Sequence, residues 1–149
     1  MIDEKLYLRK VEPGEWIKVL KFEKASRSKF FSALENEEEV KQYLSESEVY
    51  FVMLGNEPIG TASFKSEGDS AYMDGLTIDP KYRGKGYGKI GIHLIMEKVK
   101  KYRRVYLRVH PRNVGGIIVY LKEGFEIFGW EDNHYGDNEP RLLMEKLQS

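Results

Sequence analysis

The chain has 149 residues, contains no cysteine, and balances 24 lysines and arginines against 24 aspartates and glutamates, which gives a formal net charge of zero. This length suits one domain, so we expect residues 1–149 to form a single unit. The charge balance argues against nucleic acid or an anionic membrane as a partner, and the lack of cysteine excludes disulfides, thiolate nucleophiles and Cys-ligated zinc.

Two further classes of protein are disfavoured. His93, His110 and His134 stand at no spacing typical of a metal site, so we expect no bound metal. Apolar runs such as "VYFVML" are too short to cross a bilayer or to form the core of a signal peptide, which favours a cytoplasmic protein. The sequence is compatible with either a monomer or a homodimer.

The first half of the chain predicts one strand, two helices and three more strands. The strand "KLYLRKV" alternates in hydropathy and ends before Pro13 and Gly14. Two tracts with helical spacing follow, around Trp16 and around Val40. The runs "VYFVML", "IGTASFKS" and "AYMDGLTI" are separated by short turns, so we expect them to be neighbouring antiparallel strands.

The second half alternates between helices and strands. We expect a helix over about residues 86–101, the strand "RVYLRV" at residues 104–109, and a shorter helix over residues 114–122 that ends at Gly124. The segments "FEIFGW" and "RLLMEKL" then form strands around the polar loop "EDNHYGDNEP".

A glycine-rich loop, "DPKYRGKGYGKIG", lies at residues 79–91. Its GYGKIG fits the dinucleotide pattern, but three meander strands precede it and the next strand ends in Val109 and His110 without the acidic residue that binds ribose. The P-loop pattern also fails, because no Gly-Lys-Ser/Thr follows. Alternate glycines before a helix nevertheless favour an anion site, since backbone N–H groups can approach a phosphate closely. The alternative is a glycine-rich turn that only enters a helix.

Two motifs then carry a family resemblance. The stretch "LTIDPKYRGKGYG" resembles the acyl-CoA motif of the GNAT superfamily of N-acetyltransferases, Arg/Gln-x-x-Gly-x-Gly/Ala after a strand. The stretch "NVGGIIVYLKEGF" resembles the second motif, in which Asn is followed seven positions later by Tyr and then by Gly-Phe. The element order agrees as well. The resemblance implies an α/β (α+β) fold with a mixed, mostly antiparallel sheet of six to seven strands and helices on both faces.

The resemblance implies acetyl-CoA as co-substrate. In the family, the strand before the loop parts from its neighbour at a bulge, and its free backbone groups bind the pantetheine arm. The implied cofactor-binding residues are Leu76, Thr77, Ile78, Arg83, Gly84, Lys85, Gly86, Tyr87, Gly88, Lys89, Asn113 and Tyr120. Gly75 is consistent with this, because a glycine inside a strand indicates that another group approaches it closely.

Tyr120 and Asp74 are the candidate catalytic residues. By resemblance, the Tyr120 hydroxyl lies near the sulfur and acts as general acid; without the motif it would be interpreted as a packing residue. Asp74, with Tyr72 and Leu76 on the same face by alternation, is the candidate general base, directly or through water. The alternative for Asp74 is a solvated or salt-bridged carboxylate.

The sequence indicates less clearly which residues would bind the acceptor. His134 and Tyr135 stand in the loop between the last two strands, which often lines the acceptor site in this superfamily; an exposed hairpin loop is the alternative. Ribosomal-protein N-terminal acetyltransferases carry a catalytic Glu five residues before the motif Asn, where this chain has Arg108. We interpret His110 as a loop or hydrogen-bonding residue rather than the base. The acidic run "ENEEE" at residues 35–39 could attract a cationic amine, but we prefer to interpret it as a solvated first helical turn.

The sequence therefore predicts an acetyl-CoA-dependent N-acetyltransferase that transfers an acetyl group to a primary amine by direct attack in a ternary complex. Two alternatives stay open. One is a catalytically idle sensor that binds acyl-CoA, and the other is a protein acetyltransferase acting on an N-terminus or a lysine. The sequence does not choose the acceptor.

Overall fold

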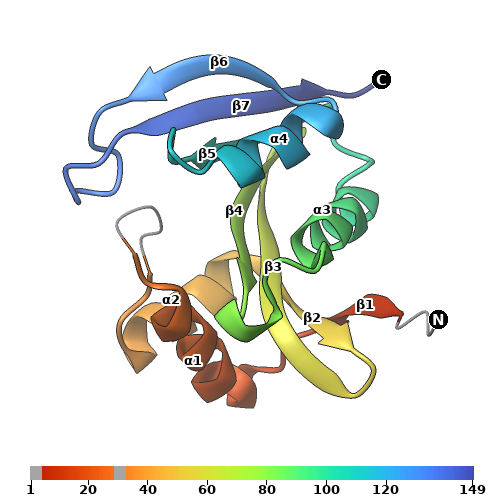
Figure 1. The fold of residues 1–149 in the computed structure, drawn as a ribbon, viewed down its shortest axis with the longest axis vertical. Coiled ribbons are helices and arrows are strands. Elements are labelled where there is room, and N and C mark those ends of the chain that lie inside the picture. Colours follow the sequence, from red (N-terminus) through yellow and green to blue (C-terminus); the bar gives the residue numbers. More distant parts are fainter. Residues whose placement is uncertain (1–4, 29–32) are drawn as a thin grey trace.

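The computed structural model describes residues 5–28 and 33–149, and the strands within these ranges form one sheet in the order β1-β2-β3-β4-β5-β7-β6 (Figure 1). The strands are β1 (Leu6–Lys10), β2 (Glu48–Leu54), β3 (Glu57–Glu67), β4 (Ser70–Ile78), β5 (Arg104–Val109), β6 (Glu126–Glu131) and β7 (Arg141–Leu147). The helices are α1 (Trp16–Ser26), α2 (Glu37–Glu46), α3 (Tyr87–Lys98) and α4 (Val114–Lys122), with short 3-10 turns at Pro13–Glu15 and Pro80–Tyr82.

The pairing confirms the predicted mixed, mostly antiparallel sheet. Only β4 and β5 run parallel, and the other neighbours in the described sheet are antiparallel. The element order also agrees with the prediction. The helix expected through residue 101 ends earlier, at Lys98, because the backbone N–H of Val99 already turns back to the carbonyl of Met96.

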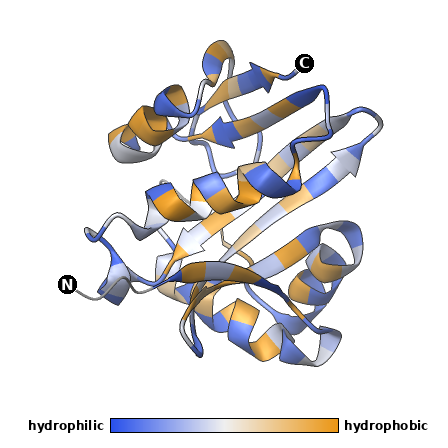
Figure 2. Ribbon diagram, turned by 90° about the vertical axis from the view of Figure 1, so that its right-hand side faces the viewer, coloured by the Kyte–Doolittle hydropathy of each residue, from blue (hydrophilic) through white to orange (hydrophobic). Residues whose placement is uncertain are grey.

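Helices cover both faces of the sheet, as predicted. In Figure 1, α1 and α2 lie on one side of β3 and β4, and α3 lies on the other. The α3 side packs Ile92 and Ile95 against Leu107, whereas the α1–α2 side packs Val19 and Val40 around strand β2. Figure 2 shows hydrophobic and hydrophilic residues interspersed along these helices, as expected when one face of each helix turns to a core.

A β-bulge in β4 changes which side chains share a face. Ser63 of β3 pairs with Gly75, whereas Lys65 pairs with Tyr72, so β4 contains one additional residue between these pairs. The Asp74 carboxylate reaches Ser63, and a Cβ on Gly75 would also meet the Ser63 hydroxyl, so two consecutive residues point toward α2.

The bulge corrects one expectation. Leu76 does not share the face of Asp74, because the side chain turns to the α3 core, where Gly91 leaves room for it. Simple alternation along the strand fails at the bulge because the extra residue reverses the side-chain direction for every residue after it.

Strands β4 and β5 separate where the site lies. Their parallel pairing runs from Ser70–Arg104 to Met73–Leu107, and beyond it no described strand pairs with β4 on that side. The unpaired backbone and the ends of both strands therefore face the same opening. In the part of the chain that the structure describes, no helix combines the length and apolar character needed to span a membrane.

Candidate active site

Two adjoining cavities lie around the separation of β4 and β5. The larger cavity, of about 520 Å³, is lined by Glu23, Ala33, Leu34, Glu35, Glu39, Tyr43, Met73, Asp74, Gly75, Leu76, Leu107, Arg108, Val109, His110, Asn113, Tyr120, Tyr135 and Arg141. The loop cavity, of about 340 Å³, is lined by Leu76, Ile78, Tyr82, Arg83, Gly84, Gly86, Tyr87, Gly88, Lys89, Ile92, Gly115, Gly116, Val119 and Tyr120. Leu76 and Tyr120 belong to both, so they mark the junction.

The glycine loop shapes one end of the loop cavity. Gly84 and Gly86 have φ of 77° and 83°, a left-handed conformation that strains any other residue except occasionally Asn or Asp. Gly86 is the N-cap of α3, so the first N–H groups of this helix and the positive end of its dipole lie at the cavity. A Cβ on Gly88 would meet no atom within 4 Å. This geometry suits an anion close to the backbone.

The basic residues of the loop differ in their availability. The guanidinium of Arg83 is held by the protein, since Nε donates to the Ile78 carbonyl (3.0 Å) and one terminal nitrogen donates to the Ser26 hydroxyl (3.2 Å). Lys89 lines the loop cavity, whereas Lys85 is absent from the lining and places its ammonium 5.8 Å from the Tyr82 ring centroid. The charge nearest a bound anion therefore comes from Lys89 and the helix end.

The three strand residues expected to bind the cofactor arm face different ways. The Asp79 N–H donates to the Ile59 carbonyl of β3, and hydrogen-bonded pairs in an antiparallel ladder recur at every second residue. The backbone groups of Thr77 therefore face β3, and its side chain is buried outside both linings. The backbone groups of Leu76 and Ile78 face the opening, although the Ile78 carbonyl already accepts from Arg83.

Helix α4 brings Asn113 and Tyr120 to the cavities. Asn113 is the N-cap, and its side-chain oxygen accepts from the Gly116 N–H at 3.1 Å. A Cβ on Gly116 would stand 2.8 Å from the Asn113 amide nitrogen, so this glycine makes room for the cap. Asn113 lines the larger cavity rather than the loop cavity, while Tyr120, seven residues later, reaches both.

The Tyr120 hydroxyl lies at the junction of the cavities. Its ring is half-buried and packs edge-to-face on Phe125, with centroids 5.9 Å apart. No described residue forms a hydrogen bond with the hydroxyl. Burial raises the pKa of Tyr120 to about 12, so it stays protonated and can donate a hydrogen bond at neutral pH.

Asp74 is held by hydroxyl groups rather than by a cation. Ser47 donates to one carboxylate oxygen at 2.5 Å and Ser63 to the other at 2.7 Å, and the Tyr43 hydroxyl donates in turn to Ser63. Burial raises the pKa of Asp74 despite these donors. Asp74 lines the larger cavity, but both of its oxygens already accept a hydrogen bond.

Sequence reasoning missed Glu23, a buried carboxylate in the same cavity. Its side chain lies on α1 and is 7% exposed, and one carboxylate oxygen, Oε2, has no hydrogen-bond partner among the described residues. Burial, assisted by the charge of Asp74, raises the pKa of Glu23 to about 7, against a backbone hydrogen bond from Leu34. The spacing of Val19, Phe22 and Ser26 could have revealed it, because Glu23 falls on their buried helix face.

The acidic run at residues 35–39 has two roles in the structure. As predicted, it supplies the acidic first turn of α2, and Asn36 caps that helix by accepting from the Glu39 N–H at 2.9 Å. Glu35 and Glu39 also line the larger cavity, at its exposed edge. Together with Glu23 and Asp74, they give the α1–α2 side of the cavity an acidic lining.

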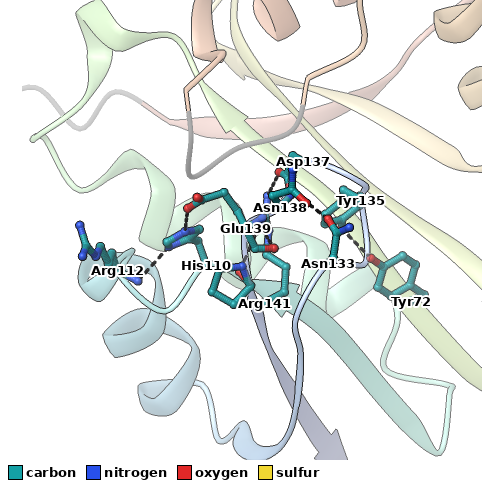
Figure 3. A network of polar contacts seen from close by, with 10 residues as sticks. Tyr72, His110, Arg112, Asn133, Tyr135, Asp137, Asn138, Glu139 and Arg141 are labelled. Carbon is teal, nitrogen blue, oxygen red and sulfur yellow. Dashed lines mark hydrogen bonds and ion pairs between the residues drawn. The ribbon is translucent and has the colours of Figure 1, made fainter.

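The loop between β6 and β7 forms the opposite wall (Figure 3). Tyr135 lines the larger cavity, and its hydroxyl lies 3.0 Å from that of Tyr72. His134 is outside both linings, and its ring packs on Tyr135. Arg141 is buried, forms an ion pair with Asp137 at 2.9 Å, and lies over the Tyr135 ring.

Arg108 of β5 and His110, which follows the end of that strand at Val109, complete this wall. His110 is 3% exposed; Nε2 lies 2.7 Å from a Glu139 oxygen and Nδ1 accepts the Arg112 N–H, as shown in Figure 3, which confirms the predicted hydrogen-bonding role. Arg108 forms an ion pair with Glu131 at 2.6 Å. In the described ranges, no group of three or more His, Asp or Glu residues is arranged to hold a metal ion.

A family comparison decides the classification. The model of the acetyltransferase (GNAT) family matches residues 16–125, which cover most of the sheet, the glycine loop and α4. The chain belongs to the GNAT acetyltransferase family. The resemblance noted from the two sequence motifs is thereby confirmed.

Solved structures agree with this GNAT assignment at the level of the fold. The ribosomal-protein-S18-alanine N-acetyltransferase of Escherichia coli superposes with a TM-score of 0.81 at 16% identity, over 97% of this chain and 95% of that one. A GNAT acetyltransferase from Elizabethkingia anophelis, solved with acetyl-CoA bound, superposes with a TM-score of 0.77 at 20% identity, over 98% and 99%.

One curated relative has a named activity. Over 61 residues, the chain is 31% identical to the spermine/spermidine N(1)-acetyltransferase of Bacillus subtilis. The match covers 39% of this chain and 40% of that protein, so the similarity extends over less than half of either.

Proposed function

We propose that this GNAT protein is an acetyl-CoA-dependent N-acetyltransferase that transfers the acetyl group to a primary amine by direct attack in a ternary complex. The observation that carries the proposal is the position of Tyr120, whose hydroxyl has no hydrogen-bond partner among the described residues and lies between the loop cavity and an acid-lined cavity. One cavity suits an anionic cofactor and the other a cationic acceptor. In this proposal, the thioester bond that breaks lies at the junction of the two cavities, next to the Tyr120 hydroxyl.

Acetyl-CoA fits the loop cavity in this proposal. Its pyrophosphate binds the N–H groups at the start of α3, near Gly86 and Gly88, with Lys89 adding charge. The pantetheine arm then follows the open edge of β4, where the backbone groups of Leu76 and Ile78 are directed. The acetyl-CoA in the Elizabethkingia structure supports this choice of ligand at the level of the shared fold.

The chemistry follows from the junction. A neutral amine in the larger cavity attacks the thioester carbonyl, and the carbon–sulfur bond breaks as electrons move onto sulfur. The Tyr120 hydroxyl donates a hydrogen bond to the sulfur and protonates it. Proton transfer from a phenol of pKa about 12 to a thiolate of about 8.5 is unfavourable in isolation. The hydroxyl therefore contributes most as a donor while charge develops in the transition state.

The acidic wall supports a cationic acceptor. Glu23, Glu35, Glu39 and Asp74 all line the larger cavity, and Asp74 remains a candidate for the general base, within reach of the same space. Tyr135 is the residue of the β6–β7 loop proposed to contact the acceptor. The partial similarity to the B. subtilis spermine/spermidine acetyltransferase favours a small amine over a protein, although the E. coli structure of similar fold is that of a ribosomal-protein-S18-alanine N-acetyltransferase.

A panel assay tests the proposal. Release of the CoA thiol is followed with acetyl-CoA and polyamines, aminoglycosides, and peptides with free N-termini or lysines. We expect turnover with one class of primary amine, and a rise in the melting temperature with CoA but not with NADH, because only a ligand of the native state stabilises it. Stabilisation by CoA without turnover of any amine would instead favour the catalytically idle acyl-CoA sensor.

We also propose a cytoplasmic location, because the reaction draws on acetyl-CoA and an amine rather than on a membrane partner. The proposed reaction is compatible with either a monomer or a homodimer.

A further inference from the structure

We infer that Glu23 is the residue that receives the acceptor, binding the substrate ammonium with its carboxylate and taking one proton from it before the attack. The inference deepens the proposed function and rests on it. It assigns a role to a side chain of α1, an element that neither sequence motif includes.

The geometry of Glu23 is that of a group awaiting a ligand. A carboxylate that is 7% exposed ordinarily needs partners for both oxygens, since an unpaired buried polar atom is costly. In the described part of the chain, Oε2 has none, and Glu23 lines the larger cavity. A primary ammonium in that cavity would supply the missing donor and the compensating charge.

Asp74 is less suited to the same role. Its two oxygens accept from Ser47 and Ser63, so an incoming ammonium would have to displace a hydroxyl donor. Among the described residues, Glu23 accepts one hydrogen bond, from the Leu34 backbone, and its Oε2 has no partner. Asp74 is therefore a positioning residue in this scheme, and its charge makes proton uptake by Glu23 easier.

The charged and titratable groups around Glu23 favour a cation. Those that share its side of the cavity are Tyr43 from α2, Asp74 from β4, and Glu35 and Glu39 at the exposed edge, where Glu35 also forms an ion pair with Arg27 at 3.7 Å. Across the cavity, Arg108 and Arg141 are each paired with a carboxylate, of Glu131 and Asp137. An amine entering from solvent thus passes the exposed acids before it reaches Glu23.

The reaction balances with these groups. The acceptor enters as an ammonium, and the Glu23 carboxylate takes one proton to leave a neutral amine. The nitrogen then bonds to the thioester carbon, the carbon–sulfur bond breaks, and Tyr120 protonates the departing sulfur. The nitrogen loses its second proton, which restores the Tyr120 phenol through water, and Glu23 releases its proton to solvent. The products are the amide, CoA thiol and one proton.

The test is Glu23→Gln, which keeps the side-chain size and the contact to Leu34. We expect kcat/KM for the amine to fall by about 10²- to 10⁴-fold, the usual contribution of a positioned base, with little change in CoA affinity. The wild-type profile of kcat/KM should carry an inflection near pH 7 that the variant loses, so that its activity rises steadily toward the pKa of the amine. A structural role alone would not remove that inflection.

Glu38→Gln is the matched control, because it removes the same negative charge from an exposed residue in the first turn of α2, outside the cavity lining. It should keep the wild-type profile. Should Glu23→Gln fold poorly, judged by CoA binding, Glu23→Asp serves instead, since a shorter carboxylate retains the inflection at reduced activity. Wild-type kcat/KM and an unchanged profile in Glu23→Gln would overturn the inference.

The inference can fail separately from the proposed function. If Glu23→Gln turns over the amine as the wild type does, the acetyltransferase proposal stands and the role of Glu23 is wrong. If the wild type acetylates no amine, the role of Glu23 is tested by calorimetric binding of the same amines to the CoA-loaded protein. Binding that Glu23→Gln abolishes supports the ammonium site, and binding that it leaves unchanged contradicts it.

Discussion

The hydroxyl of Tyr43 on α2 occupies the space in which Gly75 of β4 lacks a side chain: a Cβ on residue 75 would stand 3.0 Å from that hydroxyl. The same Cβ would stand 2.9 Å from the Ser63 hydroxyl, which links Tyr43 to Asp74. Gly75 thus permits the chain of hydrogen bonds that fixes the Asp74 carboxylate. The sequence predicted that another group approaches Gly75 closely. In the structure, the groups that do so are the Ser63 and Tyr43 hydroxyls of the protein itself.

We therefore predict that Gly75→Ala destabilises the fold, because a methyl group must displace two hydrogen-bonded hydroxyls. The expected loss is about 1–3 kcal/mol in the free energy of unfolding, measured with urea. Gly115→Ala is the matched control, since a Cβ there meets nothing within 4 Å and alanine favours the helix. Equal stability of the two variants would show that the Tyr43 contact at Gly75 has no energetic weight.

The second prediction concerns the anion site at α3. Gly88→Leu should weaken CoA binding by more than about tenfold, because a large side chain at the second helix position blocks approach to the N–H groups. Folding should hold or improve, since a Cβ there meets no atom and leucine is the better helix former. Calorimetric titration with CoA and thermal unfolding measure the two effects.

Gly88→Ala provides the comparison, because the family motif admits alanine at this position, and it should keep its CoA affinity. Gly86 is unsuited to this experiment because its φ of 83° would strain any side chain and destabilise the loop itself. If Gly88→Leu binds CoA as tightly as the wild type does, the pyrophosphate lies elsewhere.

Much of the fold could be predicted from the sequence because its signals are local. Hydrophobic period and turn residues placed the elements, and the two motifs placed the glycine loop and Tyr120. The face of Leu76 could not be predicted, because it depends on a bulge created by the register of β3 against β4. The directions of Thr77 and Arg83 likewise depend on pairing and on contacts between distant segments.

The acceptor side of the site was harder to predict from the sequence, because it also depends on contacts between distant segments. Glu23 lies about fifty residues before Asp74 in the chain, and only the packing of α1 over β4 brings both to one cavity. The hydrophobic periodicity of α1 could have identified Glu23 as a buried acid, but it could not have shown which residues Glu23 faces.

The third prediction is a pH dependence of stability that requires no substrate. The pKa of Glu23 is raised from 4.5 to about 7 in the folded state, so the folded protein binds this proton more tightly than the unfolded chain. Its contribution to stability is therefore fully present below pH 4.5 and is lost as pH rises toward 7. At about 1.4 kcal/mol for each pH unit, the loss is on the order of 3 kcal/mol.

Glu23→Gln carries no such proton, so its stability relative to the wild type should increase as the pH rises. We expect similar free energies of unfolding near pH 4.5 and a more stable variant above pH 7. Urea unfolding of both proteins at several pH values measures the difference, in which the other titrating groups largely cancel. A difference that does not vary with pH would mean that Glu23 keeps its ordinary pKa.

The fourth prediction separates Asp74 from Glu23. The charge of Asp74 contributes to raising the pKa of Glu23, so Asp74→Asn should lower it and move the inflection of kcat/KM to lower pH. The maximum rate at high pH should change less than in Glu23→Gln. If Asp74→Asn instead abolishes the inflection, Asp74 is itself the titrating base, as the sequence suggested.

The most direct test of the central claim is the turnover number of Tyr120→Phe with acetyl-CoA and the best amine of the panel. The variant keeps the ring and its contact with Phe125 but lacks the hydroxyl at the junction of the cavities. We predict unchanged CoA affinity and melting temperature, with kcat lower by about 10²- to 10⁴-fold at every pH. Wild-type kcat, with the chemical step shown to limit the rate, would contradict the account and return Tyr120 to a packing role.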